Sequence, residues 1–296
     1  MGRIAVTGSS GLIGTALVSA LRERGDEAVR LVRRPPRAPD ELQWDPSTRR
    51  LDPAALDGVD GVVHLAGAGV GDRRWSPAHK REVLASRTDS TTAVATAVAQ
   101  ADHPVRLVSG SAVGYYGDRG DEELTEASPP GTGFLADVVL AWEAAARPAV
   151  DAGASVAFVR TGIVLSPQGG AMKPLLRLAR FGLAGPLGSG RQFWPWITLA
   201  DEVGALLHLL DHPQVTGPVN LAAPSPARQR EIVAALGRAL HRPAVLWAPS
   251  PALHVVLGEF AGEVLGSQRI VGNALADSGY ACSHRDLDTA MRWLVG

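Results

Sequence analysis

Short apolar runs alternate with longer amphipathic segments through the first half of the chain. Buried parallel strands are typically continuous apolar runs, and this predicts strands at Ile4–Thr7, Ala28–Val32, Gly61–Leu65, Arg106–Ser109 and Val156–Arg160. Apolar residues at helical spacing predict helices over Leu12–Arg24, Pro77–Ala99 and Leu135–Val150. The alternation indicates an α/β fold, in which helices cover a parallel sheet.

The pattern changes after Thr161. A glycine-rich stretch covers residues 169–190, and a strand-like run at Pro218–Leu221 then precedes a predicted helix at Arg228–Leu240. Further helical patterns lie at Ala252–Leu265 and Arg285–Leu294. We therefore expect a first domain over residues 1–223, of which residues 165–198 contribute to a smaller C-terminal α/β lobe completed by residues 224–296.

Charge and composition narrow the classes of partner. The 296 residues include 29 Lys+Arg and 30 Asp+Glu, a net charge of −1, which offers no strong field to nucleic acid or an anionic membrane. Cys282 is the single cysteine, so neither an internal disulfide nor a cysteine-rich metal site is expected. No apolar stretch suits a signal peptide or a membrane helix. We expect a soluble, cytoplasmic protein without metal that takes a small-molecule substrate, and a homodimer is left open.

A glycine triplet with the spacing G-x-x-G-x-x-G joins the first predicted strand to the first predicted helix. Glycine permits a tight turn and the close approach of a phosphate, and the helix N-terminus adds unpaired N–H groups and a favourable dipole. An ordinary strand–helix turn is the alternative. The residues expected to bind a dinucleotide here are Gly8, Ser10, Gly11, Leu12, Ile13 and Gly14.

Two arginines stand where a dinucleotide-binding fold usually places an acidic residue on the ribose. Arg33 follows Gly14 by 19 residues, Arg34 is next to it, and no acidic residue occurs between Glu27 and Asp40. A guanidinium suits a 2′-phosphate and has no special affinity for a bare ribose. The pair therefore favours NADP over NAD, unless both arginines only solvate a loop.

Several longer segments together resemble one family. The segments are TGSSGLIG (7–14), HLAG (64–67), SGSAVGYYGD (109–118), RTGIVLSPQGGAM (160–172), GPLGSGRQFWPWI (185–197) and LGSQRI (265–270). They are similar to the sugar-nucleotide epimerase-like branch of the extended short-chain dehydrogenases, in the NAD-dependent epimerase/dehydratase superfamily. Members of that branch end in a characteristic domain of unknown function and are often mislabelled cell-division inhibitors.

The resemblance implies a Rossmann domain with a doubly wound parallel sheet and the nucleotide at the carboxyl edge of its strands. It also implies roles for residues beyond the glycine loop. Glu82 and Arg87 would reach the cofactor from the next helix, the alternative being a solvated helix face. The further cofactor-binding residues implied are Leu65, Ala66 and Gly67 on the adenosine side, Ser109, and Ile163 with Val164 beside the nicotinamide.

Catalytic residues of this class are a serine, then a tyrosine and a lysine at Y-x-x-x-K. Ser111 fits the serine, whereas Phe134 and Val138 occupy the tyrosine and lysine positions and cannot move a proton. Tyr115 and Tyr116 therefore become the candidate proton donors. The alternative is structural, with one ring packed under the loop and the other lining the substrate pocket.

One loop carries candidate substrate contacts. Arg191, Trp194 and Trp196 would suit a flat or sugar-like anionic ligand. The preferred hypothesis is an NADP-dependent oxidoreductase or epimerase acting on a small polar or nucleotide-linked substrate. The alternative is a non-catalytic NADPH sensor or scaffold protein. His64 is interpreted as a buried, hydrogen-bonded core residue.

Overall fold

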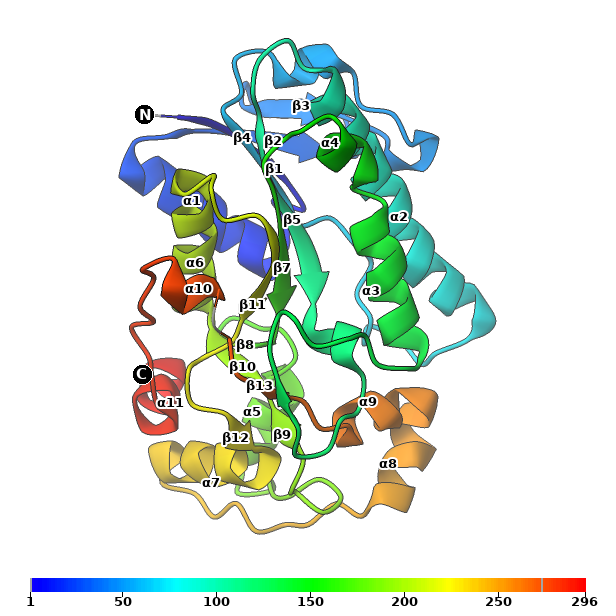
Figure 1. Cartoon of the computed structure of the whole chain (residues 1–296). Helices are drawn as coiled ribbons and strands as arrows, with labels where there is room; N and C mark the ends of the chain where they lie inside the picture. The colour runs from blue at the N-terminus through cyan, green and yellow to red at the C-terminus, as the bar shows by residue number, and fades with distance from the viewer. Residues whose placement is uncertain (1, 273) are drawn as a thin grey trace.

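The computed structural model describes residues 2–272 and 274–296, and a seven-stranded sheet of parallel strands forms its centre (Figure 1). The strand order is β11-β7-β5-β4-β1-β2-β3, so the direction of winding reverses between β1 and β4. A reversal of this kind leaves a crevice at the carboxyl ends of the strands. The strands are β1 Arg3–Thr7, β2 Glu27–Val32, β3 Glu41–Gln43, β4 Gly61–His64, β5 Arg106–Ala112, β7 Val156–Thr161 and β11 Gly217–Leu221.

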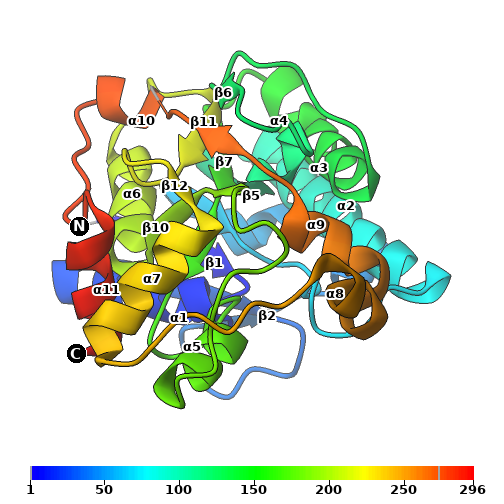
Figure 2. The same ribbon diagram turned by 90° about the horizontal axis from the view of Figure 1, so that it is seen from below.

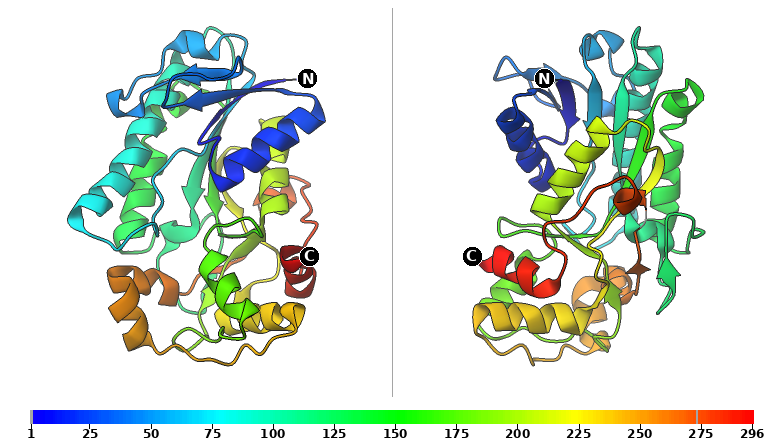
Figure 3. Two further views of the ribbon diagram at one scale, coloured as in Figure 1. Left: turned by 180° about the vertical axis from the view of Figure 1, so that it is seen from behind. Right: turned by 60° about the vertical axis from the view of Figure 1, so that its left-hand side comes forward.

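Helices cover both faces of this sheet, as the two views of Figure 3 show. The helices α1 (Leu12–Arg24) and α6 (Leu199–Asp211) lie on one face, and α2 (Pro77–Gln100), α3 (Phe134–Ala144) and α4 (Arg147–Asp151) lie on the other. Alternate strand residues supply the two cores. Val6 and Val63 pack with α1 and α6, whereas Ala5 and Val62 pack with α2. The predicted doubly wound α/β fold is confirmed.

A smaller lobe lies beyond the carboxyl ends of the central strands (Figures 1 and 2). Its core joins Leu176, Trp196, Leu236 and Met291. The lobe's helices are α5 (Lys173–Arg180), α7 (Gln229–Leu240), α8 (Ser250–Leu257), α9 (Ala261–Leu265) and α11 (Leu287–Val295), whereas α10 (Ala274–Asp277) packs against the sheet core beside α6. Short 3-10 turns are η1 (Pro46–Thr48), η2 (Pro53–Leu56), η3 (Val113–Tyr116) and η4 (Gly258–Phe260).

Three short strand pairs connect the lobe to the sheet domain. They are β8 (Ile163–Leu165) with β10 (Trp196–Thr198), β9 (Phe193–Trp194) with β12 (Ala227–Arg228), and β6 (Glu123–Leu124) with β13 (Arg269–Ile270). Next to the last pair, the Ser267 amide donates to Asp118 at 3.0 Å, and the Ser267 hydroxyl donates to the Gly120 carbonyl at 2.6 Å. The C-terminal segment is thereby fixed to the loop that follows β5.

The structure differs from the predicted helices in two places. The helix expected over Leu135–Val150 is divided into α3 and α4, because Pro148 has no N–H with which to continue the helical ladder. The helix expected over Ala252–Leu265 is divided at Gly258, whose φ of +64° ends α8. The prediction also omitted α5, α6 and the three-residue β3. Among the described helices, none is long and apolar enough to cross a bilayer.

One acidic side chain, Glu202 on α6, is completely buried between the sheet and the lobe. Its Oε1 accepts a hydrogen bond from the Thr161 hydroxyl at 2.8 Å, and its Oε2 has no partner among the described residues. Burial raises the pKa of this carboxyl to about 8. At neutral pH the folded protein therefore holds a proton on Glu202, whereas the unfolded chain has already released it.

Glu202→Gln should abolish a pH dependence of stability. With the folded pKa raised, the stability contribution of Glu202 is complete below its ordinary pKa and declines as pH rises toward about 8. Relative to that of the wild type, the free energy of unfolding of the variant should rise by at most about 1.4 kcal/mol per pH unit between pH ~5 and ~8. Denaturant unfolding across that range measures the difference, with Glu23→Gln on exposed α1 surface as control. A constant difference at all pH values would contradict the assignment.

Candidate functional site

The glycine loop between β1 and α1 is shaped by close backbone contacts. Gly8 has a φ of +66°, and its carbonyl accepts a hydrogen bond from the Gly11 amide at 2.9 Å. A Cβ on Gly14 would lie 2.2 Å from the same carbonyl oxygen, so this position requires glycine. Gly11 is the N-cap of α1, and no side chain caps the helix there. The first amides of α1 are thus left for an anion.

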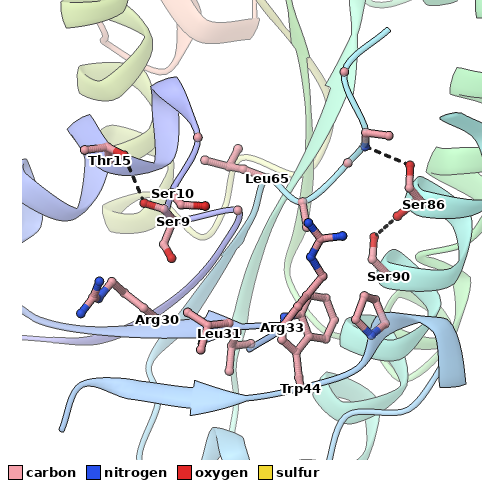
Figure 4. A pocket seen from close by; sticks show the side chains of 18 of the residues that line it. Ser9, Ser10, Thr15, Arg30, Leu31, Arg33, Trp44, Leu65, Ser86 and Ser90 are labelled. Atoms are coloured by element: carbon pink, nitrogen blue, oxygen red, sulfur yellow. Dashed lines mark hydrogen bonds between the residues drawn. The ribbon is translucent and has the colours of Figure 1, made fainter. Parts of the chain in front are cut away.

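A cleft of about 1520 Å³ opens in front of this loop. Its walls are the glycine loop, the ends of β2 and β4, and the N-terminal half of α2. Figure 4 shows Ser9 and Ser10 on one side and Ser86 and Ser90 of α2 on the other. The cleft brings together three predicted residues of the glycine loop, Gly8, Ser10 and Gly11, and the three predicted for the adenosine side, Leu65, Ala66 and Gly67.

The two predicted arginines behave differently in the folded chain. Arg34 donates two hydrogen bonds to the buried Glu41 of β3, at 2.8 and 2.7 Å, and they hold the pKa of the Glu41 carboxyl at about 2. Arg33 is exposed and has no ion pair with any described residue. Its side chain rises from the end of β2 toward the space between Leu65 and Ser86 (Figure 4). Arg33 is therefore the free guanidinium of the cleft.

Of the two predicted residues of α2, Glu82 lines the cleft, and Arg87 lies behind Gly67, outside the lining. Glu82 is exposed, lines the cleft and accepts a hydrogen bond from Arg73 at 2.8 Å. Arg87 donates to the Ala68 carbonyl at 2.9 Å, and its guanidinium lies 5.0 Å from the Trp142 ring centre. Burial lowers the pKa of Arg87 to about 10, which leaves it charged at neutral pH.

A buried ion pair lies beside the predicted catalytic serine. The Ser111 hydroxyl donates to Glu143 at 2.6 Å, and Arg160 donates two hydrogen bonds of 2.9 Å to the same carboxylate. Burial by itself would lower the pKa of Arg160, but the hydrogen bonds to Glu143 raise it overall. Neither Glu143 nor Arg160 was predicted from the sequence. The arginine that follows the apolar residues of β7 could have indicated this pair, because a buried arginine needs an acidic partner.

The two tyrosines after β5 occupy different environments. Tyr116 is completely buried, accepts a hydrogen bond from Arg160 at 3.0 Å and donates one to Asn220 at 2.8 Å. Burial raises the pKa of its phenol, with Arg160 opposing the shift. The candidacy of Tyr116 as a proton donor is thereby corrected, since substrate cannot reach it. Tyr115 is half-buried, with the Arg160 guanidinium 3.5 Å from its ring centre.

Phe134 occupies the expected tyrosine position and takes part in an aromatic cluster. Its ring lies edge-on to Trp75 at 4.9 Å, and the Trp75 ring also contacts Phe260 of the C-terminal lobe at 5.6 Å. Lys80 pairs with Glu259 and lies 5.1 Å from the Phe134 ring. Val138, in the lysine position, is buried. This end of α3 therefore joins the lobe to the sheet domain.

The predicted substrate residues do not form one surface. Trp196 is 1% exposed, belongs to the lobe core and donates its indole N–H to the Ser225 carbonyl, so its assignment to a substrate site is corrected. Trp194 is half-buried and donates to the Val264 carbonyl at 3.0 Å. Arg191 is exposed. Trp196 was misassigned because a tryptophan in a polar loop has the same sequence appearance whether its ring points inward or outward.

The remaining predicted residues lie at the same edge of the sheet. Ser109 is buried in the middle of β5, paired with His64 at the end of β4, and Ile163 and Val164 belong to β8 directly after β7, outside the lining of the cleft. Both nitrogens of the buried His64 have hydroxyl partners, Thr7 at 2.8 Å and Thr91 at 3.0 Å, which confirms its interpretation as a core residue. Within residues 2–272 and 274–296, no group of His, Cys, Asp and Glu could hold a metal.

Comparisons with known proteins agree on one family. The model of the NAD dependent epimerase/dehydratase family matches residues 4–222, and a domain of unknown function, DUF1731, matches residues 248–294. An epimerase family protein of Mycobacterium tuberculosis is 44% identical over 289 residues, covering 97% of this chain and 96% of its own length. The expected domain boundary at residue 223 stays a prediction.

Two solved structures are similar over the whole chain. The human epimerase family protein SDR39U1, crystallised with NADPH, superposes with a TM-score of 0.91 at 36% identity, over 99% of this chain and 98% of that one. A nucleoside-diphosphate sugar epimerase from Corynebacterium glutamicum gives a TM-score of 0.82 at 35% identity. This chain is covered completely in that comparison and spans 58% of the corynebacterial chain.

Gly14→Ala should abolish dinucleotide binding, because the new Cβ would lie 2.2 Å from the Gly8 carbonyl oxygen and force the loop to move. Titration calorimetry with NADPH measures the loss, and we expect at least about a hundredfold weaker binding. Gly262→Ala on α9 is the matched control, since nothing lies within 4 Å of its added Cβ. A folded Gly14→Ala protein with the affinity of the wild type would show that this loop is not the binding site.

Proposed function

Because the chain belongs to the NAD-dependent epimerase/dehydratase family, we propose that it binds NADPH in the cleft and acts as an oxidoreductase or epimerase. The observation that carries the cofactor choice is the unpaired Arg33 guanidinium at the end of β2, where Arg34 is already held by Glu41. The human relative crystallised with NADPH supports the same choice. The proposed substrate is a small polar or nucleotide-linked compound.

The residues of the cleft fit the parts of this cofactor. The uncapped N-terminus of α1 would take the pyrophosphate, and Gly8, Gly11 and Gly14 let it approach the backbone. Arg33 would bind the 2′-phosphate. Arg87 and Glu82 would contact the cofactor from α2, and Ile163 and Val164 would lie beside the nicotinamide. When bound, the cofactor supplies or accepts a hydride.

The chain's own groups would then handle the proton. Ser111 donates a hydrogen bond to the Glu143 carboxylate, so the serine oxygen would take the proton of a substrate hydroxyl as its own proton passes to Glu143. In the opposite direction Ser111 would turn its proton toward a substrate carbonyl. Tyr115 has no hydrogen-bond partner among the described residues at its phenol, so it is the remaining donor. Tyr116 would act as a positioning residue through Arg160.

A second candidate function, a non-catalytic NADPH sensor or scaffold, follows from one specific observation. Phe134 and Val138 stand where this class carries its tyrosine and lysine, and Phe134 is engaged with Trp75 and Lys80. A cofactor could bind in the cleft without these two residues, whereas proton transfer would have to rely on Ser111 and Tyr115. Turnover distinguishes the two functions, because both include tight NADPH binding.

Arg33→Ala should remove most of a preference for NADPH over NADH. We expect the wild type to bind NADPH at least tenfold more tightly than NADH, which is about 1.4 kcal/mol. Arg34→Ala is the matched comparison. It should keep that preference while lowering stability, because it leaves the buried Glu41 without its bidentate partner. Calorimetry with both nucleotides measures the six affinities of the wild type and the two variants. Equal affinities in the wild type, or loss of preference only in Arg34→Ala, would refute the assignment.

Any reductase activity should depend on Ser111 and Tyr115. We expect Ser111→Ala and Tyr115→Phe each to slow NADPH oxidation by about a hundredfold, the usual contribution of a positioned acid or base. The assay panel should include a quinone and a nucleotide-linked keto sugar. Tyr116→Phe should lower thermal stability instead, since its phenol joins Arg160 to Asn220. Full activity in both Ser111→Ala and Tyr115→Phe would exclude this catalytic site. No turnover despite tight NADPH binding would favour the sensor.

A further inference from the structure

Large apolar side chains are exposed together on one side of the C-terminal lobe. Phe181 and Val245 are each 80% exposed, and Trp247 is 62% exposed. Leu178, Leu183 and Leu246 are also exposed in the same two segments, which are α5 with its following loop and residues 242–248. Single exposed apolar residues are ordinary, but a cluster of this kind marks an interaction surface.

The two segments run side by side, so their exposed residues form one surface. The Leu246 amide donates to the Ala184 carbonyl at 3.1 Å, and the Ala248 amide donates to the Pro186 carbonyl at 2.9 Å. The Arg242 side chain donates to the Arg180 carbonyl at 3.3 Å. In Figure 2 the chain between α7 and α8 crosses the side of the lobe that also carries α5. We call this surface the lobe face.

Cations surround the apolar residues of the lobe face, and acids are missing from its sequence. Lys173, Arg177, Arg180 and Arg242 are exposed and form no ion pair with any described residue. No Asp or Glu occurs between Asp151 and Asp201, nor between Glu231 and Glu259. The net charge of −1 is a sum over the whole chain, and it is compatible with a locally basic surface.

The local structure allows the apolar side chains to leave water at little cost. On α5, Leu175, Leu176 and Ala179 face the lobe core, which turns Arg177, Leu178 and Arg180 outward. The indole N–H of Trp247 already donates to the Gly188 carbonyl at 2.6 Å, so no unpaired donor would enter an apolar medium. Apolar residues with flanking Lys and Arg are the composition of helices that lie in a membrane interface.

We propose that the lobe face docks on an anionic lipid surface. A second copy of this chain is a poor occupant, because a two-fold interface would bring the same unpaired cations together without a carboxylate between them. No ion pair fixes these long side chains in one geometry, which suits a fluid layer of lipid phosphates better than the fixed carboxylates of an acidic protein. The inference goes beyond the proposed function and does not depend on it.

Flotation with lipid vesicles tests the proposal. The probes are vesicles of equal parts phosphatidylcholine and phosphatidylglycerol, and vesicles of phosphatidylcholine alone. We expect the full chain to float with the anionic vesicles only and to be released by raised salt. Arg177→Gln with Arg180→Gln should weaken binding about 25-fold, at about fivefold for each charge. Phe181→Ser with Val245→Ser should weaken it by at least as much.

A matched pair on α4 serves as control, because it removes one exposed cation and one exposed apolar residue from the opposite end of the molecule. Arg147→Gln with Val150→Ser should bind vesicles like the wild type. Thermal melting confirms that each variant is folded. The proposal is overturned if folded wild type ignores anionic vesicles, or if the control weakens binding as much as the lobe-face variants do. Poly-glutamate serves as an acidic polypeptide probe, and the proposal is also overturned if the full chain binds poly-glutamate but not the anionic vesicles. It is overturned as well if ultracentrifugation shows that the wild type is a dimer and that the lobe-face variants are monomers.

Discussion

The ion pair between Arg160 and Glu143 is the interaction on which the side-chain network around Ser111 depends. It joins the end of β7 to α3, and its two ends hold Ser111 and Tyr116 through hydrogen bonds of 2.6 and 3.0 Å. A buried charge that loses its partner costs several kcal/mol, so the four groups are constrained together. The pair also fixes Tyr115, whose ring lies against the Arg160 guanidinium.

The cleft in front of the glycine loop and the side-chain network around Ser111 are built in different ways. The cleft relies mainly on backbone, namely the turn at Gly8, the uncapped start of α1 and the close contact at Gly14. The network around Ser111 consists of side chains from β5, α3, β7 and β11, and these side chains are joined to one another by hydrogen bonds. Backbone geometry tolerates change in the surrounding side chains, whereas a side-chain network changes as a unit.

The sequence predicted those features whose signal is local. The spacing of apolar residues predicted α1 to the residue, and the glycine triplet predicted the loop before it. It could not separate Arg33 from Arg34, because their difference depends on Glu41 in a strand of three residues. Glu143 and Arg160 were missed for the same reason, since their contact joins two separate elements. Net charge concealed the lobe face, because a sum carries no information on where the charges lie.

The contact between Ser267 and Asp118 bears on the order in which the protein assembles. The two residues are 149 positions apart in the chain, so closing that loop costs more conformational entropy than forming the neighbouring turns. The core between the sheet and α2 consists of residues that precede Ser267, whereas the join between lobe and sheet needs the C-terminal segment. Contacts of such high sequence separation are slow to form. We therefore expect the loop that follows β5 to be fixed to the lobe late in folding, after the glycine loop before α1 has its structure.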